Sequence, residues 1–257
     1  MKPIAHRFLL ALALWLASFG PASADPCRRE AFEGASYIVC SFDLAKDDLR
    51  MFWKDGEGTP YKTFPVLADA LKGQGLTLAF AMNGGMYDEN FSPVGLYIEG
   101  GRELALANTK TVTGEPAKIP NFYKQPNGVF YVGDDDAGVL ETGLFLNVRP
   151  ETVFATQSGP MLVIDGKIHP AFIEGSTDLK PRDGVGVSSP TEVHFAISEG
   201  RVNFYDFARF FRDKLGCKNA LFLDGGSAPG LFSPELDRAD APGHGGYGPI
   251  IAVVKAP

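Results

Sequence analysis

Short apolar runs that end in glycine-bearing polar turns recur along this 257-residue chain, and they constrain its fold more than any other feature. The clearest example is the apolar run Asn219–Leu223, which is followed by Asp224, Gly225, Gly226 and Ser227. A run of this length and composition predicts a buried strand, so a carboxylate stands where a core strand ends. The two glycines allow a turn with positive φ and a close approach of a ligand to the main chain. Because Asp-Gly is also a common tight turn, this motif alone leaves a purely structural interpretation open.

Four further clusters share this arrangement of strand, polar residue and glycine. They are Asn83-Gly84-Gly85, Asn127-Gly128, Gln157-Ser158-Gly159 and Arg182-Asp183-Gly184. Each has a simpler interpretation as a turn, a loop or a surface ion pair, but five such clusters in one domain favour a converging polar pocket. In that pocket Asn83 can donate and accept hydrogen bonds, and Arg182 suits a phosphate or carboxylate because its planar fork matches two oxygens.

The overall pattern predicts a single α+β domain with a large mixed or antiparallel sheet and two or three helices. Asp165-Gly166 separates two short predicted strands, 161–164 and 167–169, in the manner of a β-hairpin. One helix is predicted over 64–72. Another is predicted over 204–215, where apolar residues recur at helical spacing between Asn203, a suitable N-cap, and Gly216, a suitable stop.

The first 24 residues have the pattern of a secretory signal peptide. A positively charged start precedes the apolar stretch 8–19, which is too short to span a membrane, and residues 22–24 form a small-residue cleavage site. We therefore expect residues 1–24 to be removed and residues 25–257 to form the mature domain, which would be periplasmic or secreted. No other apolar run is long enough for a membrane span.

The charge of the chain limits its partners. The formal net charge is −7, and removal of the signal peptide makes it about −9. An acidic chain without a lysine- or arginine-rich run is a poor candidate for binding nucleic acid or an anionic membrane surface. An anionic substrate would therefore depend on a few local arginine, lysine or backbone N–H groups. The sequence does not define the oligomeric state.

Three cysteines remain in the expected mature chain. Cys27 and Cys40 lie close together near its start, and in an exported protein this favours a disulfide between them. Cys217 is left over and is interpreted as a small buried apolar side chain rather than a reactive thiol.

No cofactor is assigned from the sequence. None of the four histidines has the spacing of a zinc site. Ligation of a hard cation such as calcium or magnesium by Asp224 and backbone carbonyls remains open. His244 lies in the glycine-rich stretch 243–248 and either reaches the predicted pocket or is simply exposed; the second interpretation is favoured.

In their order along the chain, these clusters resemble the phosphodiester glycosidase domain, the family of the lysosomal uncovering enzyme that removes N-acetylglucosamine from a sugar-phosphate diester. The bacterial exported branch of that family is the more similar one. The resemblance runs from about residue 37 to 254, and its most specific parts are 81–87, 157–162 and 219–225. Two departures stand out. Ser227 follows Gly226 directly where the family commonly has another glycine, and Asp183 stands where a neutral residue is expected.

The resemblance implies a hydrolase that cleaves a glycosyl phosphodiester in envelope or exopolysaccharide material, with Asp224, Arg182 and Asn83 in the active site. It also implies substrate contacts from Gly84, Gly85, Asn127, Gln157, Ser158, Gly159, Gly225, Gly226 and Ser227. Cleavage at the anomeric carbon expels a weakly basic phosphate ester, which a cation such as Arg182 would stabilise. A carboxylate such as Asp224 would stabilise the oxocarbenium-like centre, act as nucleophile or activate water.

Three alternatives remain open at this stage. Asp88 and Glu89 are either a source of the second carboxylate or part of a solvated loop, the second being favoured. The enzyme could instead be a phosphodiesterase that cleaves the P–O bond. The domain could also bind glycans without catalysis, since a fold does not determine a function.

Overall fold

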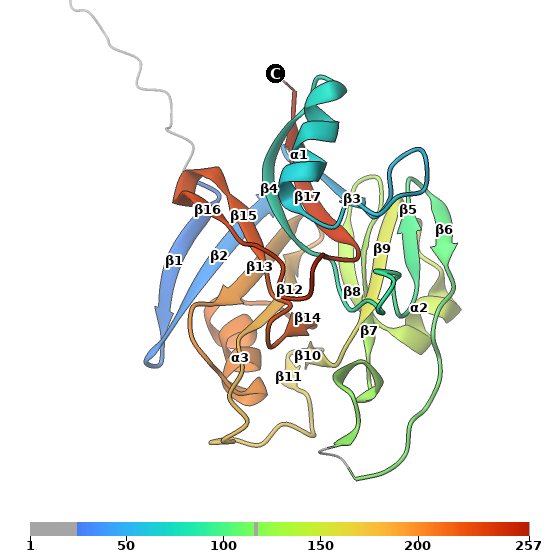
Figure 1. Cartoon of the computed structure of the whole chain (residues 1–257). Coiled ribbons are helices and arrows are strands. Elements are labelled where there is room, and N and C mark those ends of the chain that lie inside the picture. The colour runs from blue at the N-terminus through green and yellow to red at the C-terminus, as the bar shows by residue number, and fades with distance from the viewer. Residues whose placement is uncertain (1–24, 116–117, 257) are drawn as a thin grey trace, which may run out of the picture.

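The computed structural model describes residues 25–115 and 118–256, and it has the α+β architecture predicted from the sequence. Its strands form three antiparallel sheets within one domain (Figure 1). Segment 1–24, predicted to be the signal peptide, lies outside the described residues. Within the described ranges, no helix is long and apolar enough to cross a membrane.

The largest sheet has seven strands, and two five-stranded sheets accompany it. In spatial order the first contains β1 (Cys27–Phe32), β2 (Ala35–Asp43), β13 (Glu192–Ser198), β12 (Arg182–Ser189), β14 (Asn219–Gly225), β10 (Met161–Ile164) and β11 (Lys167–Ile168). The second contains β16 (Arg238–Ala239), β15 (Leu231–Ser233), β4 (Thr77–Asn83), β17 (Ile250–Lys255) and β3 (Asp48–Phe52). The third contains β6 (Arg102–Ala105), β5 (Tyr97–Glu99), β9 (Phe154–Ser158), β7 (Gly128–Val132) and β8 (Ala137–Glu141).

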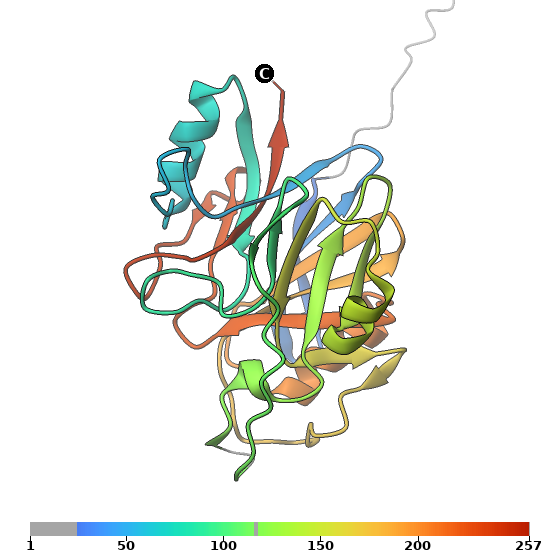
Figure 2. The ribbon, with the colours of Figure 1, turned by 90° about the vertical axis from the view of Figure 1, so that its right-hand side faces the viewer.

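The three sheets enclose a common apolar core (Figure 2). Phe195 of the first sheet lies at its centre, with ring centroids 5.1 Å from Phe80 of the second sheet and 5.9 Å from Phe130 of the third. All three rings are completely buried. Burial of large aromatic side chains contributes strongly to stability, so this contact fixes the sheets relative to one another.

The aromatic stripe predicted to form a helix does so, and it covers the outer face of the seven-stranded sheet. It forms α3 (Phe204–Arg209), which continues as a π-helical turn over Phe210–Lys214. As predicted, Asn203 caps the start, where its side chain accepts the Asp206 N–H at 2.8 Å. The Phe210 ring stacks on Tyr37 of β2 with centroids 3.9 Å apart, so the stripe serves core packing.

The other helices cover the smaller sheets. α1 (Phe64–Gly73) matches the helix predicted over 64–72 and lies beside β4 and β17 in Figure 1. α2 (Thr142–Val148) packs on the third sheet, where Phe145 contacts Tyr131 with ring centroids 5.7 Å apart. Short 3-10 turns occupy Asn121–Tyr123 and Pro234–Leu236.

The predicted disulfide is present. Cys27 of β1 and Cys40 of β2 are directly opposite in the strand register and are joined by their sulfurs. Cys217 is a buried free cysteine, as predicted, and its sulfur lies over Gly186, where an added Cβ would collide with it. Burial raises the pKa of its thiol to about 12, which makes it unreactive at neutral pH.

Candidate active site

Three strand ends, one from each sheet, meet at a single place in the molecule. The Ser158 hydroxyl at the end of β9 donates a hydrogen bond to the Leu223 carbonyl of β14 at 2.8 Å. The Thr156 hydroxyl, also on β9, donates to the Gly84 carbonyl just beyond β4 at 2.6 Å. The polar clusters that follow β4, β9 and β14 therefore lie together, and the hydrogen bonds between sheets hold them there.

Two aspartates from neighbouring strands face each other at this junction. Asp183 of β12 and Asp224 of β14 are register partners, and a β-bulge follows them. The backbone N–H of Asp224 donates to Asp183 Oδ1 at 2.8 Å, and the N–H of Gly225 donates to Asp224 Oδ1 at 2.7 Å. Asp183 is wholly buried, whereas Asp224 is partly exposed because one side of it opens to a pocket.

Both carboxyl groups have raised pKa values. Burial raises the pKa of Asp224 to about 7, against the opposing effect of the hydrogen bond from Gly225. The pKa of Asp183 is raised well above its ordinary value, first by burial and then by the charge of Asp224. Two close buried carboxyls do not both ionise readily, so burial and mutual repulsion both favour a proton held by the pair. A group that titrates near pH 7 is well suited to acid–base chemistry.

Asn83 completes the inner part of the junction. It is completely buried, and its Oδ1 accepts the Gly230 N–H at 2.9 Å. Among the described residues, neither Asn83 Nδ2 nor Asp183 Oδ2 has a partner in hydrogen-bonding geometry. The amide nevertheless lies near enough to favour the charged form of Asp183, although burial outweighs it. A buried donor and a buried acceptor that remain unpaired side by side are unusual, and such groups concentrate at functional sites.

A pocket of about 470 Å³ opens above Asp224. It is lined by Tyr87, Asp88, Glu89, Phe91, Asp224, Gly225, Ala228 and His244. The Tyr87 and Phe91 rings are stacked with centroids 5.9 Å apart. Burial raises the pKa of Tyr87 to about 12, and the charge of Asp224 adds to the effect. The pocket thus joins an aromatic wall to a buried acidic pair, an arrangement typical of a small-ligand site.

Arg182 does not take the position predicted for it. Its side chain is only 1% exposed, and it does not line the pocket. The guanidinium lies 3.6 Å from the centre of the Phe204 ring, and it donates to the carbonyls of Val202 at 2.9 Å and Asp178 at 3.1 Å. Successive side chains of a strand point to opposite faces. The Asp183 side chain points toward Asp224. The side chain of its neighbour Arg182 therefore points the other way, toward α3, where it packs on Phe204.

Most of the other predicted contact residues support the pocket without lining it. Gln157 and Asn127 are buried and hydrogen-bonded to the protein. Their partners include the Leu96 and Asn108 N–H groups for Gln157 and the Thr142 hydroxyl for Asn127.

The glycines allow close packing around the junction. Gly84 donates its N–H to the Pro249 carbonyl at 2.7 Å, Gly85 has φ 122° beside Thr156, and Gly159 packs against Asn127. Gly225 lines the pocket itself, and Gly226 turns the chain with φ 74°. Ser227 lies at the rim, where its hydroxyl is 2.8 Å from His244 Nε2.

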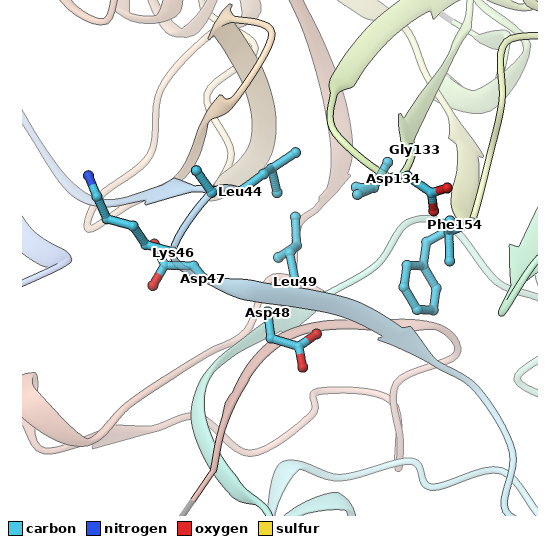
Figure 3. Close-up of a pocket in the computed structure, with 11 residues that line it drawn as sticks. Leu44, Lys46, Asp47, Asp48, Leu49, Gly133, Asp134 and Phe154 are labelled. Carbon is cyan, nitrogen blue, oxygen red and sulfur yellow. The ribbon is translucent and has the colours of Figure 1, made fainter.

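A second pocket, of about 410 Å³, is shown in Figure 3. It is formed by segments 44–49, 132–134 and 153–154. None of the residues predicted to carry chemistry lines it. The pocket above Asp224 is therefore the candidate active site.

The sequence allows a hard cation to bind at Asp224. Within the described ranges, no group of three or more histidine, cysteine, aspartate or glutamate side chains is placed to hold a metal ion.

Comparison with known proteins agrees with the resemblance seen in the sequence. The family model described as phosphodiester glycosidase matches residues 77–247, which is more than half of the chain. An uncharacterized protein of Escherichia coli K12, YigE, is 35% identical over 216 residues, covering 83% of this chain and 81% of that protein.

Solved structures show the same fold. The catalytic domain of the zebrafish N-acetylglucosamine-1-phosphodiester alpha-N-acetylglucosaminidase, auto-inhibited by its pro-peptide, matches with a TM-score of 0.60 and 16% identity over 88% of this chain and 81% of that one. A putative exported protein of Burkholderia pseudomallei matches with a TM-score of 0.52 and 12% identity over 85% of this chain and 74% of that one. The fold and the family model together define a glycosidase-type hydrolase domain. The chain belongs to the phosphodiester glycosidase family.

Proposed function

We propose that this protein is an exported hydrolase that cleaves a glycosyl phosphodiester between the anomeric carbon and the phosphate oxygen. One observation carries the proposal: Asp224, with a pKa of about 7, stands at the pocket beside the buried Asp183. Membership in the phosphodiester glycosidase family supports the substrate class. Envelope or exopolysaccharide phosphodiesters are the proposed natural substrates.

The chemistry follows from the leaving group. When the C–O bond breaks, its electron pair goes to the oxygen of a phosphate ester, which is a weak base and needs little protonation. The sugar carbon develops positive charge, and the Asp224 carboxylate is placed to stabilise it. Asp224 then either bonds to that carbon, from which water later displaces it as the carboxylate, or takes a proton from the water that attacks the carbon directly. Both routes place the oxygen of water on the sugar, and both use the ionised form of Asp224.

The lining of the pocket favours attack at carbon over attack at phosphorus. Transfer of a phosphoryl group relies on cationic groups clamped around the phosphate oxygens. In the described part of the chain, no arginine or lysine lines the pocket, whereas three carboxylate residues do: Asp88, Glu89 and Asp224. An acidic pocket is better matched to a cationic sugar transition state.

Export is part of the proposal. The sequence pattern of residues 1–24 and the Cys27–Cys40 disulfide both support an oxidising compartment. Protein recovered from the periplasm or the medium should begin at Asp25 when its N-terminus is sequenced. Recovery of a chain that still begins at Met1 would contradict export.

The proposed activity can be tested by incubating the purified mature protein with a panel of glycosyl phosphodiesters and identifying the products by mass spectrometry. We expect free sugar and the phosphomonoester of the other substituent. Release of a sugar phosphate and a free alcohol would instead indicate cleavage of the P–O bond. Binding of the substrates without any product would indicate a glycan-binding domain.

A further inference from the structure

Recognition of the phosphate presents a problem that the structure itself raises. A phosphodiester is negatively charged, yet the pocket is lined by three carboxylate residues. Arg182, the cation expected from the sequence, is enclosed behind the sheet. Lys62 is near the rim, but its ammonium lies 4.4 Å from the centre of the Phe91 ring and does not line the pocket. The one nitrogenous side chain among the lining residues is the imidazole of His244.

Two hydrogen bonds and one close backbone contact fix the position of the segment that carries His244. The Tyr87 hydroxyl donates to the Gly246 carbonyl at 2.8 Å, and the Tyr247 N–H donates to the Lys62 carbonyl at 2.6 Å. Gly243 packs so closely on Ser227 that a Cβ there would collide with the Ser227 carbonyl. The glycine loop therefore has a defined path, and it places the exposed His244 ring over the turn that follows Asp224.

His244 and Ser227 form a hydrogen-bonded pair with 2.8 Å between Nε2 and Oγ. When Nε2–H donates to the serine, the serine hydroxyl proton is free to point toward a ligand. When the serine donates to Nε2 instead, the other ring nitrogen carries its proton outward. In either tautomer the pair presents a hydrogen-bond donor to a ligand.

We propose that His244 and Ser227 are the phosphate-recognition pair of this site, and that they make the protein select phosphodiester glycosides. This inference rests on the proposed function and assigns the orientation of its substrate. The phosphate lies toward Ser227 and His244, the anomeric carbon lies at Asp224, and the sugar ring packs on the Tyr87–Phe91 wall. Donors held at the departing phosphate stabilise the charge that develops on it as the C–O bond breaks.

The test measures phosphate binding separately from catalysis. Methyl phosphate, a phosphomonoester that represents the leaving group, and the free sugar product are titrated into the mature protein by calorimetry. For His244→Ala we expect at least about a tenfold loss of affinity for methyl phosphate and unchanged affinity for the sugar. Ser227→Ala should show a smaller loss in the same direction. Lys72→Gln, which removes an exposed charge of α1 outside the pocket, is the control and should bind both ligands as the wild type does.

The outcomes separate this inference from the proposed function. Equal affinity of the wild type and His244→Ala for methyl phosphate, or no binding of methyl phosphate by the wild type, would overturn the inference even if phosphodiesters are hydrolysed. Parallel losses of phosphate and sugar affinity would also overturn it, because they would show that the loop had simply collapsed. Phosphate binding that depends on His244, in a protein that hydrolyses no phosphodiester, would support the inference and refute the proposed activity.

Discussion

Asp224→Asn is expected to lower kcat/KM for a glycosyl phosphodiester on the order of 10³-fold, because it removes the charge and basicity that the reaction uses at the sugar carbon. The amide keeps the size of the carboxyl and its ability to accept the Gly225 N–H, so the fold should not change. Steady-state kinetics and circular dichroism measure the two effects. Asp135→Asn, on an exposed acidic turn, is the matched control and should behave as the wild type. Full activity of Asp224→Asn would show that Asp224-Gly225 is only a turn.

The same variant should be more stable than the wild type at alkaline pH. Burial raises the pKa of Asp224 from its ordinary value of 3.8 to about 7, so the folded protein holds this proton more tightly than the unfolded chain. The contribution of this group to the free energy of unfolding therefore falls as the pH rises from about 4 to about 7. Asparagine cannot ionise and avoids that loss. We expect a gain of roughly 1–3 kcal/mol at pH 8 and little difference at pH 4, measured by urea unfolding.

Asp183→Ala is expected to reduce kcat by about 100-fold with a smaller change in KM, because the residue positions Asp224 rather than touching the substrate. Its Oδ1 accepts the Asp224 N–H at 2.8 Å, and alanine would leave that partly buried N–H without this partner. Burial and the charge of Asp224 raise the pKa of Asp183, and this favours its neutral form. Asp183→Asn should therefore restore the acceptor and recover most of the activity.

The pH dependence of the Asp183 variants distinguishes positioning from direct proton transfer. If Asp183 acts through Asp224, the limb of the kcat/KM profile near pH 7 should persist in Asp183→Asn, since Asp224 still titrates there. If Asp183→Asn folds normally but is as inactive as Asp224→Asn, Asp183 itself exchanges a proton during the reaction. That result would reject the positioning role.

Features that depend on local pattern could be predicted from the sequence. The aromatic spacing from Phe204 and the Asn203 cap define α3, and both are present in the structure. The run 219–223 is a buried strand that ends at a carboxylate. The proximity of Cys27 and Cys40 in a chain predicted to be exported led to the correct disulfide. In each case the determining contacts lie within a few residues or follow from periodicity.

Features that depend on which strands pair could not be predicted. The division into three sheets follows from nonlocal contacts such as Phe80 with Phe195. The faces of Arg182 and Asp183 depend on the register of β12 against β14 and on the bulge between them. Since a shift of one residue exchanges the two faces, the sequence pointed to Arg182 where the structure places Asp183 in the site.

Asp183 and His244 left only weak signals in the sequence. A charged residue at the start of the glycine- and valine-rich run 183–187 suggests a buried charge with a functional role. The departure from the family pattern at Asp183 was the strongest such indication. His244 stands among glycines, which do not indicate a path for the chain. Its contact with Ser227 joins residues 17 positions apart through packing that only the structure shows.

Hydrolysis in ¹⁸O-labelled water tests the central claim most directly, because it reports which bond is broken. Attack at the anomeric carbon, with Asp224 at the reacting centre, places the label in the released sugar and leaves the phosphomonoester unlabelled. Mass spectrometry of both products, taken early enough to precede exchange of the sugar with water, measures the distribution. We predict label in the sugar alone, whereas label in the phosphate would contradict the account.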